Sequence, residues 1–355
     1  MALTIRETGS GPGRAAPAGG CTACGGARVL PFCTPEQMQA LAREARAFHA
    51  ARLRSGRREE LDERASFTQD DAACLALCED CGLLLRWPRP SPDAMVRTYA
   101  GDHYPEERLA EMIAAQVSCF RGKVPLLRRL LAGGAAPRVI EVGSFVGGFL
   151  EVARTAGLRA LGVDPNPQLA ESCRERGLAV AETTLEELAR GEPAGGADAI
   201  VIWNTFDQLA DPEGVLRAAA RLVRAGGVLA LRVPHGLAFR TGHALRARAR
   251  GPRRRFLDAC LAWNNLLSFP YLHGYTVASL DRLVPRFGFR RVAVRGDVLG
   301  MLSGRATRGF ARAEERVVKQ LQLGWIALQA RDPASPLPAA PWLDLYYRRE
   351  TAPER

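Results

Sequence analysis

The sequence feature that most constrains the fold is a hydrophobic run that ends in an acid and a glycine loop, at residues 139–150. The run is rich in β-branched residues, which favours a buried strand. Gly143 and Gly147 then lead into an amphipathic pattern, so the segment predicts a strand, a tight turn and a helix N-terminus. The amides of such a turn, together with the helix dipole, suit an anionic or strongly polar ligand. Glu141, at the end of the strand, is placed to accept hydrogen bonds from an amino group.

Three more hydrophobic segments follow along the chain. Residues 160–163 predict a strand, and Asp164 follows it directly, about 20 residues beyond the glycine loop. At the end of this strand, the acid can accept hydrogen bonds from both hydroxyls of a ribose. Residues 199–203 predict a further buried strand, which a polar loop follows at residues 204–209. Residues 222–231 predict the end of a helix, a Gly-Gly turn and a further strand. The alternation predicts an α/β domain whose polar loops gather at one edge of a sheet.

In this order the segments resemble the class I S-adenosylmethionine (SAM) dependent methyltransferases, over roughly residues 126–294. In that family the acid-and-glycine loop binds the methionine part of SAM. The acid after the second strand holds the ribose, and the loop after the fourth strand faces the methyl group. The residues that the resemblance implies for SAM binding are Glu141, Gly143, Ser144, Gly147, Asp164, Asn204 and Thr205.

The sequence departs from the family pattern at two positions. Phe145 stands where a glycine is usual, which leaves the path of the loop open. Gln208 stands where many small-molecule methyltransferases carry a histidine after an acid, which removes one candidate base. These departures keep a SAM-binding protein without catalysis as an alternative.

Two C-x-x-C-G motifs predict a metal site. The two-residue gap lets both thiolates of a turn reach one metal, and two such turns complete a tetrahedral zinc site. A charged, helical insertion at residues 34–64 separates the motifs, and the alternative is a set of buried thiols. Cys33 and Cys74 have no partner in this scheme and suit core positions. The predicted ligands of a structural zinc ion are Cys21, Cys24, Cys78 and Cys81.

A competing motif uses the second group of cysteines. The spacing of Cys74, Cys78 and Cys81 matches the radical-SAM motif, in which three thiolates hold an iron–sulfur cluster. That interpretation leaves Cys21 and Cys24 unused, and the repeated strand–helix units of a radical-SAM barrel do not follow. The zinc interpretation is therefore favoured.

The region after the cysteines sharpens the resemblance. An apolar strand at residues 83–87, a proline-rich run and an aromatic segment precede the SAM domain. This arrangement resembles a bacterial methyltransferase group with an N-terminal zinc-binding module, some of whose members methylate carbon atoms of nucleotide-bound deoxysugars. In that group the module and the aromatic segment close over the substrate. The resemblance implies that Tyr104 and His103 line the site, Tyr104 beside the cofactor, whereas the alternative is ordinary packing at a domain junction.

Three histidines are candidates for a general base. His235 comes just after the strand that follows the Gly-Gly turn, where a residue of the resembled family usually faces the substrate. Histidine has a pKa suited to proton removal near neutral pH. His273 lies in a segment dense in aromatic and polar groups at residues 263–276, and His103 is the third candidate. The alternative for each is a local hydrogen-bonding or packing role.

The net charge of +11 comes almost entirely from arginine, because Lys123 and Lys319 are the only lysines. Genome composition and an anionic partner explain this equally well. The most basic stretch, residues 246–255, suits a nucleotide diphosphate, a phospholipid headgroup or RNA, and a solvated surface is the alternative. Few aromatic residues lie near it, which weakens the single-stranded RNA interpretation.

The 355 residues leave room for about two domains. We expect a disordered N-terminus at residues 1–20, a zinc-binding module at 21–104, a methyltransferase domain at 105–300 and a C-terminal helix with a docking tail at 301–355. Within the methyltransferase domain, a substrate-facing insertion is expected at about 236–276. No signal peptide or membrane-spanning run is recognised, so we expect a cytoplasmic protein.

The predicted fold is α/β, with a Rossmann-like, seven-stranded SAM methyltransferase domain after a small zinc-ribbon-like module. The predicted function is SAM-dependent methyl transfer to an oxygen, nitrogen or carbon atom of a small molecule. By analogy, this acceptor is a nucleotide sugar or another glycan or natural-product intermediate, and it carries a phosphate. An RNA or protein methyltransferase is the second alternative. The sequence makes no prediction about the oligomeric state.

Overall fold

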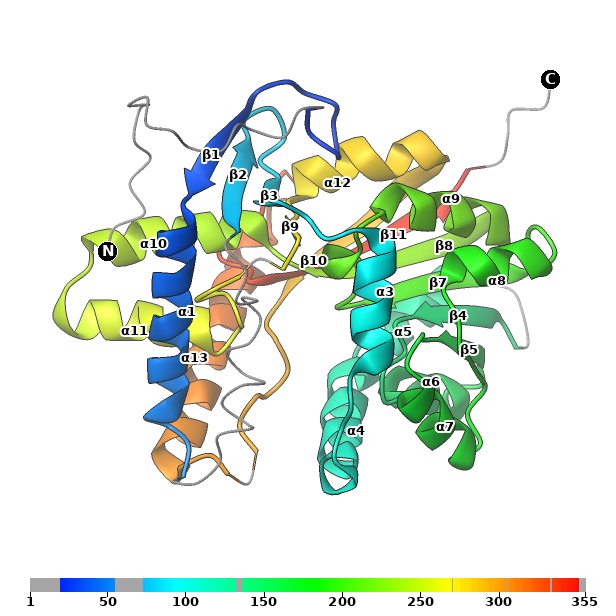
Figure 1. The fold of residues 1–355 in the computed structure, drawn as a ribbon, viewed down its shortest axis with the longest axis horizontal. Helices are drawn as coiled ribbons and strands as arrows, with labels where there is room; N and C mark the ends of the chain where they lie inside the picture. The colour runs from blue at the N-terminus through cyan, green and yellow to red at the C-terminus, as the bar shows by residue number, and fades with distance from the viewer. Residues whose placement is uncertain are drawn as a thin grey trace. The chain divides into compact units, whose positions relative to one another are not determined.

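The computed structural model describes residues 20–54, 73–131, 136–269, 271–304, 306–332 and 334–350 (Figure 1). Residues 1–19 of the expected disordered N-terminus and residues 55–64 of the expected helical insertion lie outside these residues. The chain divides into two compact units whose segments alternate along the sequence. The cysteine unit consists of the chain up to Arg89, Pro234–Leu283 and Arg295–Leu343, and the sheet unit consists of Pro90–Val233, Val284–Val294 and the chain from Asp344.

A seven-stranded sheet dominates the sheet unit. The order of its strands is β10-β11-β8-β7-β4-β5-β6. Neighbours from β8 to β6 pair in parallel, with Ile140 aligned between Ile200 and Leu161. The carboxyl ends of these strands therefore meet at one edge, and the predicted Rossmann-like seven-stranded fold is confirmed. The strands are β4 (Arg138–Val142), β5 (Arg159–Val163), β6 (Val180–Ala181), β7 (Ala197–Trp203), β8 (Val223–Pro234), β10 (Phe289–Asp297) and β11 (Trp342–Arg349).

Helices cover both faces of this sheet, with α6 and α7 below it and α9 above it in Figure 1. Side chains set where they begin: Asn166 caps α7, Asp211 caps α9, and Thr184 forms a capping box with Glu187 in α8. The helices are α3 (Pro92–Gly101), α4 (Glu106–Arg121), α5 (Val124–Leu130), α6 (Gly148–Thr155), α7 (Pro167–Glu175), α8 (Leu185–Gly191) and α9 (Pro212–Leu222), with short 3₁₀ turns at Phe206–Gln208 (η1) and Val284–Phe287 (η2).

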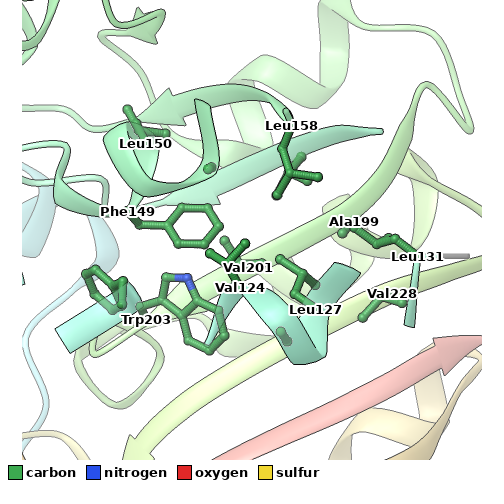
Figure 2. Close-up of a cluster of buried hydrophobic side chains, with 14 of the residues drawn as sticks. Val124, Leu127, Leu131, Phe149, Leu150, Leu158, Ala199, Val201, Trp203 and Val228 are labelled. Carbon is green, nitrogen blue, oxygen red and sulfur yellow. The ribbon is translucent and has the colours of Figure 1, made fainter. Parts of the chain in front are cut away.

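The core of the sheet unit holds the end of β7 in place (Figure 2). Trp203, the last residue of β7, packs against Phe149 of α6 and Phe120 of α4, with ring centroids 5.8 and 6.0 Å apart. All three side chains are at most 2% exposed, and full burial of a large apolar side chain contributes about 1.5–3 kcal/mol. This packing fixes the point at which the polar loop after β7 begins.

A buried charge cluster holds the C-terminal strand in the sheet. Asp344 of β11 accepts hydrogen bonds from Lys123 Nζ at 2.5 Å and from Arg232 Nη1 at 2.6 Å. The removal of one member from a buried ionic cluster leaves an uncompensated charge, which costs several kcal/mol, on the order of 3–5. The tail that was expected to dock on the domain thus contributes a strand between β10 and β8.

The cysteine unit contains a four-stranded sheet in the order β1-β2-β3-β9, with antiparallel pairs. Its core includes Leu75, Leu84, Phe239 and Leu267, so the insertion expected at residues 236–276 packs on the cysteine-bearing strands. The elements are β1 (Val29–Cys33), α1 (Pro35–Ala50), β2 (Cys74–Cys78), β3 (Leu84–Trp87), α10 (Gly236–Arg248), α11 (Gly251–Ala262), β9 (His273–Gly274), α12 (Val277–Leu283) and α13 (Gly309–Gln329). In the part of the chain that the structure describes, no helix is both long and apolar enough to cross a bilayer.

Candidate active site and cysteine cluster

The loop after β4 has a left-handed backbone at every second residue. Gly143, Phe145 and Gly147 have φ angles of 70°, 50° and 72°. Phe145 therefore takes the path that a glycine would take, although a bulky residue in this region stores strain of about 1–3 kcal/mol. Two contacts hold it: its N–H donates to Asp164 Oδ2 at 2.8 Å, and its ring meets Tyr104 edge-on, with centroids 5.2 Å apart.

Gly143 is required by a close approach between two loops. A Cβ at this position would lie 2.4 Å from the Oγ1 atom of Thr205, which follows β7. Because van der Waals contact needs far more room, only a glycine lets the loops after β4 and β7 meet here.

Two polar side chains near this loop are buried without partners. Glu141 is 1% exposed, and among the described residues its Oε2 atom has no hydrogen-bond partner. Burial, and then the nearby charge of Asp164, raise the pKa of Glu141 well above its usual value. Ser144 is also buried, and its hydroxyl likewise lacks a partner in the described chain. An unsatisfied buried polar group costs about 1–3 kcal/mol, so a ligand that donates hydrogen bonds here would offset that cost.

Asp164 stands at the end of β5 and connects two loops. Its Oδ2 accepts from Phe145 N, and its Oδ1 accepts from Asn166 N at 3.0 Å. Burial raises the pKa of this carboxyl group, although the two backbone hydrogen bonds oppose the shift. Each oxygen of a carboxylate can accept about two hydrogen bonds, so capacity for ligand hydroxyls remains on both atoms.

The aromatic segment after α3 is tied to the same site. Asn166 Nδ2 donates to the carbonyls of Tyr99 and Asp102, both at 2.8 Å. Gln168 bonds both backbone groups of Tyr104, accepting at 2.9 Å and donating at 2.6 Å. These bonds bring Tyr104 beside the glycine loop, whereas the neighbouring His103 is exposed.

Side-chain hydrogen bonds stabilise a turn in the loop after β7. Asn204 has a φ of 57°, and Thr205 Oγ1 donates to the carbonyl of Trp203 at 3.2 Å. Gln208 donates to the carbonyl of Asn204 at 2.8 Å and accepts from Tyr99 Oη at 2.7 Å. The glutamine that replaces a histidine thus supports the turn and the aromatic segment.

Asp207 lies in the loop at residues 204–209 but was not among the bases expected from the sequence. It is 1% exposed, and among the described residues neither carboxylate oxygen has a hydrogen-bond partner. Burial raises the pKa of Asp207 to about 7. Its charge in turn helps to raise the pKa of Tyr99, after the larger effect of that residue's burial. The sequence signal for Asp207 is its position directly before Gln208, because many methyltransferases of the resembled family carry an acid followed by a histidine here.

The candidate histidines belong to different units. His235 and His273 belong to the cysteine unit, and only His103 shares the sheet unit with the glycine loop. His235 is fully buried, with Nδ1 3.1 Å from the carbonyl of Ala340, and burial lowers its pKa to about 4. His273 is also fully buried: its Nε2 lies 3.3 Å from Arg89 Nη1, and its ring stacks on Tyr275.

The four predicted zinc ligands come together in the cysteine unit. The sulfur atoms of Cys21, Cys24, Cys78 and Cys81 all lie within 4.8 Å of one another. Two of the separations, Cys21–Cys81 and Cys24–Cys78, are 3.6 Å. Four sulfurs around one zinc ion at about 2.3 Å would be roughly 3.8 Å apart, so the set has the size of a tetrahedral site.

The turns that carry these cysteines have the expected glycine geometry. Gly25 and Gly82 have φ angles of 72° and 74°, and each donates its N–H to the carbonyl of the first cysteine in its turn. Cys74 lies outside the cluster, with its sulfur 3.3 Å from the carbonyl of Trp87. This grouping of the described cysteines matches the zinc interpretation rather than the radical-SAM spacing.

Comparison with known proteins identifies the family. A model of the methyltransferase domain family matches residues 113–294, about half of the chain. The chain therefore belongs to the methyltransferase domain family, as the resemblance to class I SAM-dependent enzymes had indicated.

Curated relatives match a shorter region. The ubiquinone biosynthesis O-methyltransferase of Xanthomonas oryzae pv. oryzae is 31% identical over 103 residues, which is 27% of this chain and 43% of the relative. The chain thus spans less than half the length of the curated relatives it matches.

Solved structures are similar at low identity. A SAM-dependent methyltransferase from Archaeoglobus fulgidus has a TM-score of 0.41 and 15% identity, over 65% of this chain and 92% of that one. The geranyl diphosphate C-methyltransferase of Streptomyces coelicolor A3(2) has a TM-score of 0.42 and 13% identity, over 71% and 88% of the two chains.

Proposed function

We propose that this protein transfers a methyl group from SAM to a small-molecule acceptor. The observation that carries the proposal is the buried carboxyl group of Glu141, whose Oε2 atom has no hydrogen-bond partner among the described residues, beside the left-handed loop that ends at Gly147. A site of this kind is costly to maintain unless a ligand with a donating end occupies it.

The residues fit SAM part by part. Glu141 would accept hydrogen bonds from the amino group of the methionine part, and Gly143, Ser144 and Gly147 would form its cradle. Asp164 would hold the ribose hydroxyls, for which it keeps acceptor capacity on both oxygens. We propose that Asn204, Thr205 and Tyr104 lie around the methyl-bearing end of SAM and the loop.

SAM supplies an electrophilic methyl group bound to a sulfonium sulfur. The protein's task is to align the acceptor atom with that bond, and positioning of this kind can supply much of a rate enhancement. Thr205 and Asn204 stand at the carboxyl end of β7, where the fold orients groups toward the site.

An oxygen or carbon acceptor must also lose a proton. We propose Asp207 as the base, because a pKa of about 7 gives it both protonation states near neutral pH. His103 is the alternative in the sheet unit. His235 and His273 remain candidates from the cysteine unit, although a pKa of about 4 makes His235 a weak proton acceptor.

We propose a structural zinc ion at Cys21, Cys24, Cys78 and Cys81. The set offers four sulfur ligands and no open position for a substrate, which is typical of structural rather than catalytic zinc. The ion would connect the N-terminal turn to the β2–β3 turn. The Cys81 carbonyl also accepts a 2.8 Å hydrogen bond from Thr276, which continues this connection to the start of α12.

The acceptor that we propose is a nucleotide sugar or a related glycan or natural-product intermediate, because of the resemblance of the N-terminal region to sugar methyltransferases. The 103-residue similarity to an O-methyltransferase supports an oxygen acceptor as the second candidate.

The test is methyl transfer from isotopically labelled SAM to panels of nucleotide sugars, phenols, RNA and proteins. We expect label in a small molecule, and Asp207→Asn should abolish most of it. Label only in RNA or protein would overturn the small-molecule proposal. Tight SAM binding with no labelled product in any panel would identify a non-catalytic SAM-binding protein.

A further inference from the structure

The arginine-rich stretch at residues 246–255 divides into two groups in the structure. Arg246 is buried and forms ion pairs with Glu44 of α1 and, at 2.5 Å, with Asp258 of α11. Arg254 also contacts Asp258, at 3.2 Å. These two arginines fasten the helices α10, α11 and α1 to one another, so their role is structural.

The other four arginines lie around the turn between α10 and α11, which Figure 1 shows as an antiparallel pair. Arg248, Arg250, Arg253 and Arg255 are all exposed, and none of them forms an ion pair with another described residue. Asp258 is the only acid between residues 240 and 262, and Arg246 and Arg254 already occupy it. The end of this helical hairpin therefore carries four exposed arginines that form no ion pair with any acid in the described part of the chain.

Two exposed apolar side chains accompany these charges. Leu245 is 51% exposed and precedes Arg248 by three positions on α10, and Phe256 is 43% exposed and follows Arg253 by three positions on α11. Residues three apart on a helix share a face. Each helix thus presents one apolar side chain and one cation together near the turn.

The base of the hairpin is fixed in the core. Phe239 and Leu261 are buried in one cluster, and a Cβ at Gly242 would lie 2.7 Å from Leu261 Cδ2. The two helices therefore approach each other closely at Gly242. A rigid base holds the charged end in a defined position, which lowers the entropy cost of binding through it.

We propose that the end of the α10–α11 hairpin docks on an anionic lipid bilayer. Clusters of four or more cations are attracted to anionic headgroups, and apolar side chains among them can enter the headgroup region. Nucleic acid would use the same charges, but single-strand binding relies on several aromatic platforms, and Phe256 is the only aromatic residue at this end. Free phosphate would leave the exposed leucine and phenylalanine without a role.

The experiment is sedimentation of the full-length protein with vesicles of phosphatidylcholine, with and without phosphatidylglycerol. We expect binding only to the anionic vesicles, decreasing as salt is raised. Arg248→Gln/Arg253→Gln should weaken it on the order of 30-fold, from about 1 kcal/mol for each cation. Phe256→Ser should weaken it without any change in charge.

The matched control is Arg312→Gln/Arg316→Gln on α13, which removes two exposed arginines from the same unit. It should bind as the unaltered protein does. Equal loss in the control would overturn the proposal in favour of attraction by overall charge. Absence of binding to anionic vesicles would also overturn it, as would hairpin-dependent binding of single-stranded RNA, or of inorganic phosphate, with none to vesicles.

Discussion

The backbone N–H of Phe145 donates a 2.8 Å hydrogen bond to the carboxylate of Asp164. This bond joins the loop after β4 to the end of β5, and it explains how a phenylalanine occupies a left-handed position that usually needs glycine. The same carboxylate is the proposed ribose ligand. If Asp164 holds the ribose as we propose, the loop geometry and SAM binding both depend on this side chain.

Asp164→Asn should weaken SAM binding by about 1–3 kcal/mol, because hydrogen bonds to a charged group are lost. Calorimetric titration would measure the change. Asp198→Asn is the matched control, since Asp198 lies near the start of β7, where it pairs with Arg224 and the backbone of Arg138. Equal affinities for the Asp164 variant and the unaltered protein would refute the ribose assignment.

Asp207→Asn should flatten the pH dependence of stability. The folded-state pKa of about 7 exceeds the unfolded value of about 3.9, so the native state holds a proton that the unfolded chain has released. The unaltered protein should therefore lose stability as the pH rises from about 4 to about 7, by a few kcal/mol. Denaturant unfolding across this pH range measures whether stability falls as the pH rises. An Asp207→Asn variant with the same slope of stability against pH as the unaltered protein would contradict the prediction.

Turnover measurements give an independent test of Asp207 as the general base. As a base it must be ionised, so kcat should rise with pH through about 7. Asp207→Asn should lower kcat with little effect on SAM affinity. Normal turnover in this variant, together with loss in His103→Ala, would assign the base to His103.

Cys78→Ser should lower the zinc content and destabilise the cysteine unit, because one of four ligands is lost. Metal analysis and thermal unfolding would measure both effects. Cys74→Ser should retain zinc, since Cys74 lies outside the cluster. Iron in the purified protein, lost in both variants, would instead support the radical-SAM spacing.

Glu141→Gln should affect the stability of the free protein and its affinity for SAM in different ways. Burial raises the pKa of Glu141 because a buried charge is costly, so glutamine should preserve or increase stability without ligand. SAM affinity should fall about tenfold, because the acceptor for the amino group loses its charge. A stable variant with unchanged affinity would show that Glu141 has no part in the site.

Local patterns in the sequence predict the glycine loop and the two C-x-x-C-G turns, because each depends on residues close together in the chain or on a fixed spacing within a turn. The seven-stranded fold was implied by the resemblance to class I methyltransferases. The pairing of β11 in the sheet could not be predicted in this way, because it depends on Asp344 meeting Arg232 and Lys123, which are distant in sequence.

Burial was the other quantity that the sequence did not reveal. His235 follows a strand where a base is expected, yet the structure encloses it completely, and its pKa falls to about 4. Asp207 looks like an ordinary loop acid, yet the packing around the loop excludes water from it and raises its pKa to about 7. Both effects arise from segments far apart in the chain.

The most direct test of the central claim is calorimetric titration of the purified, metal-analysed protein with SAM and with its demethylated product. We expect micromolar binding of both at one site per chain, in a protein that contains zinc and no iron. Absence of binding to either compound would contradict the proposed SAM site around Glu141 and Asp164.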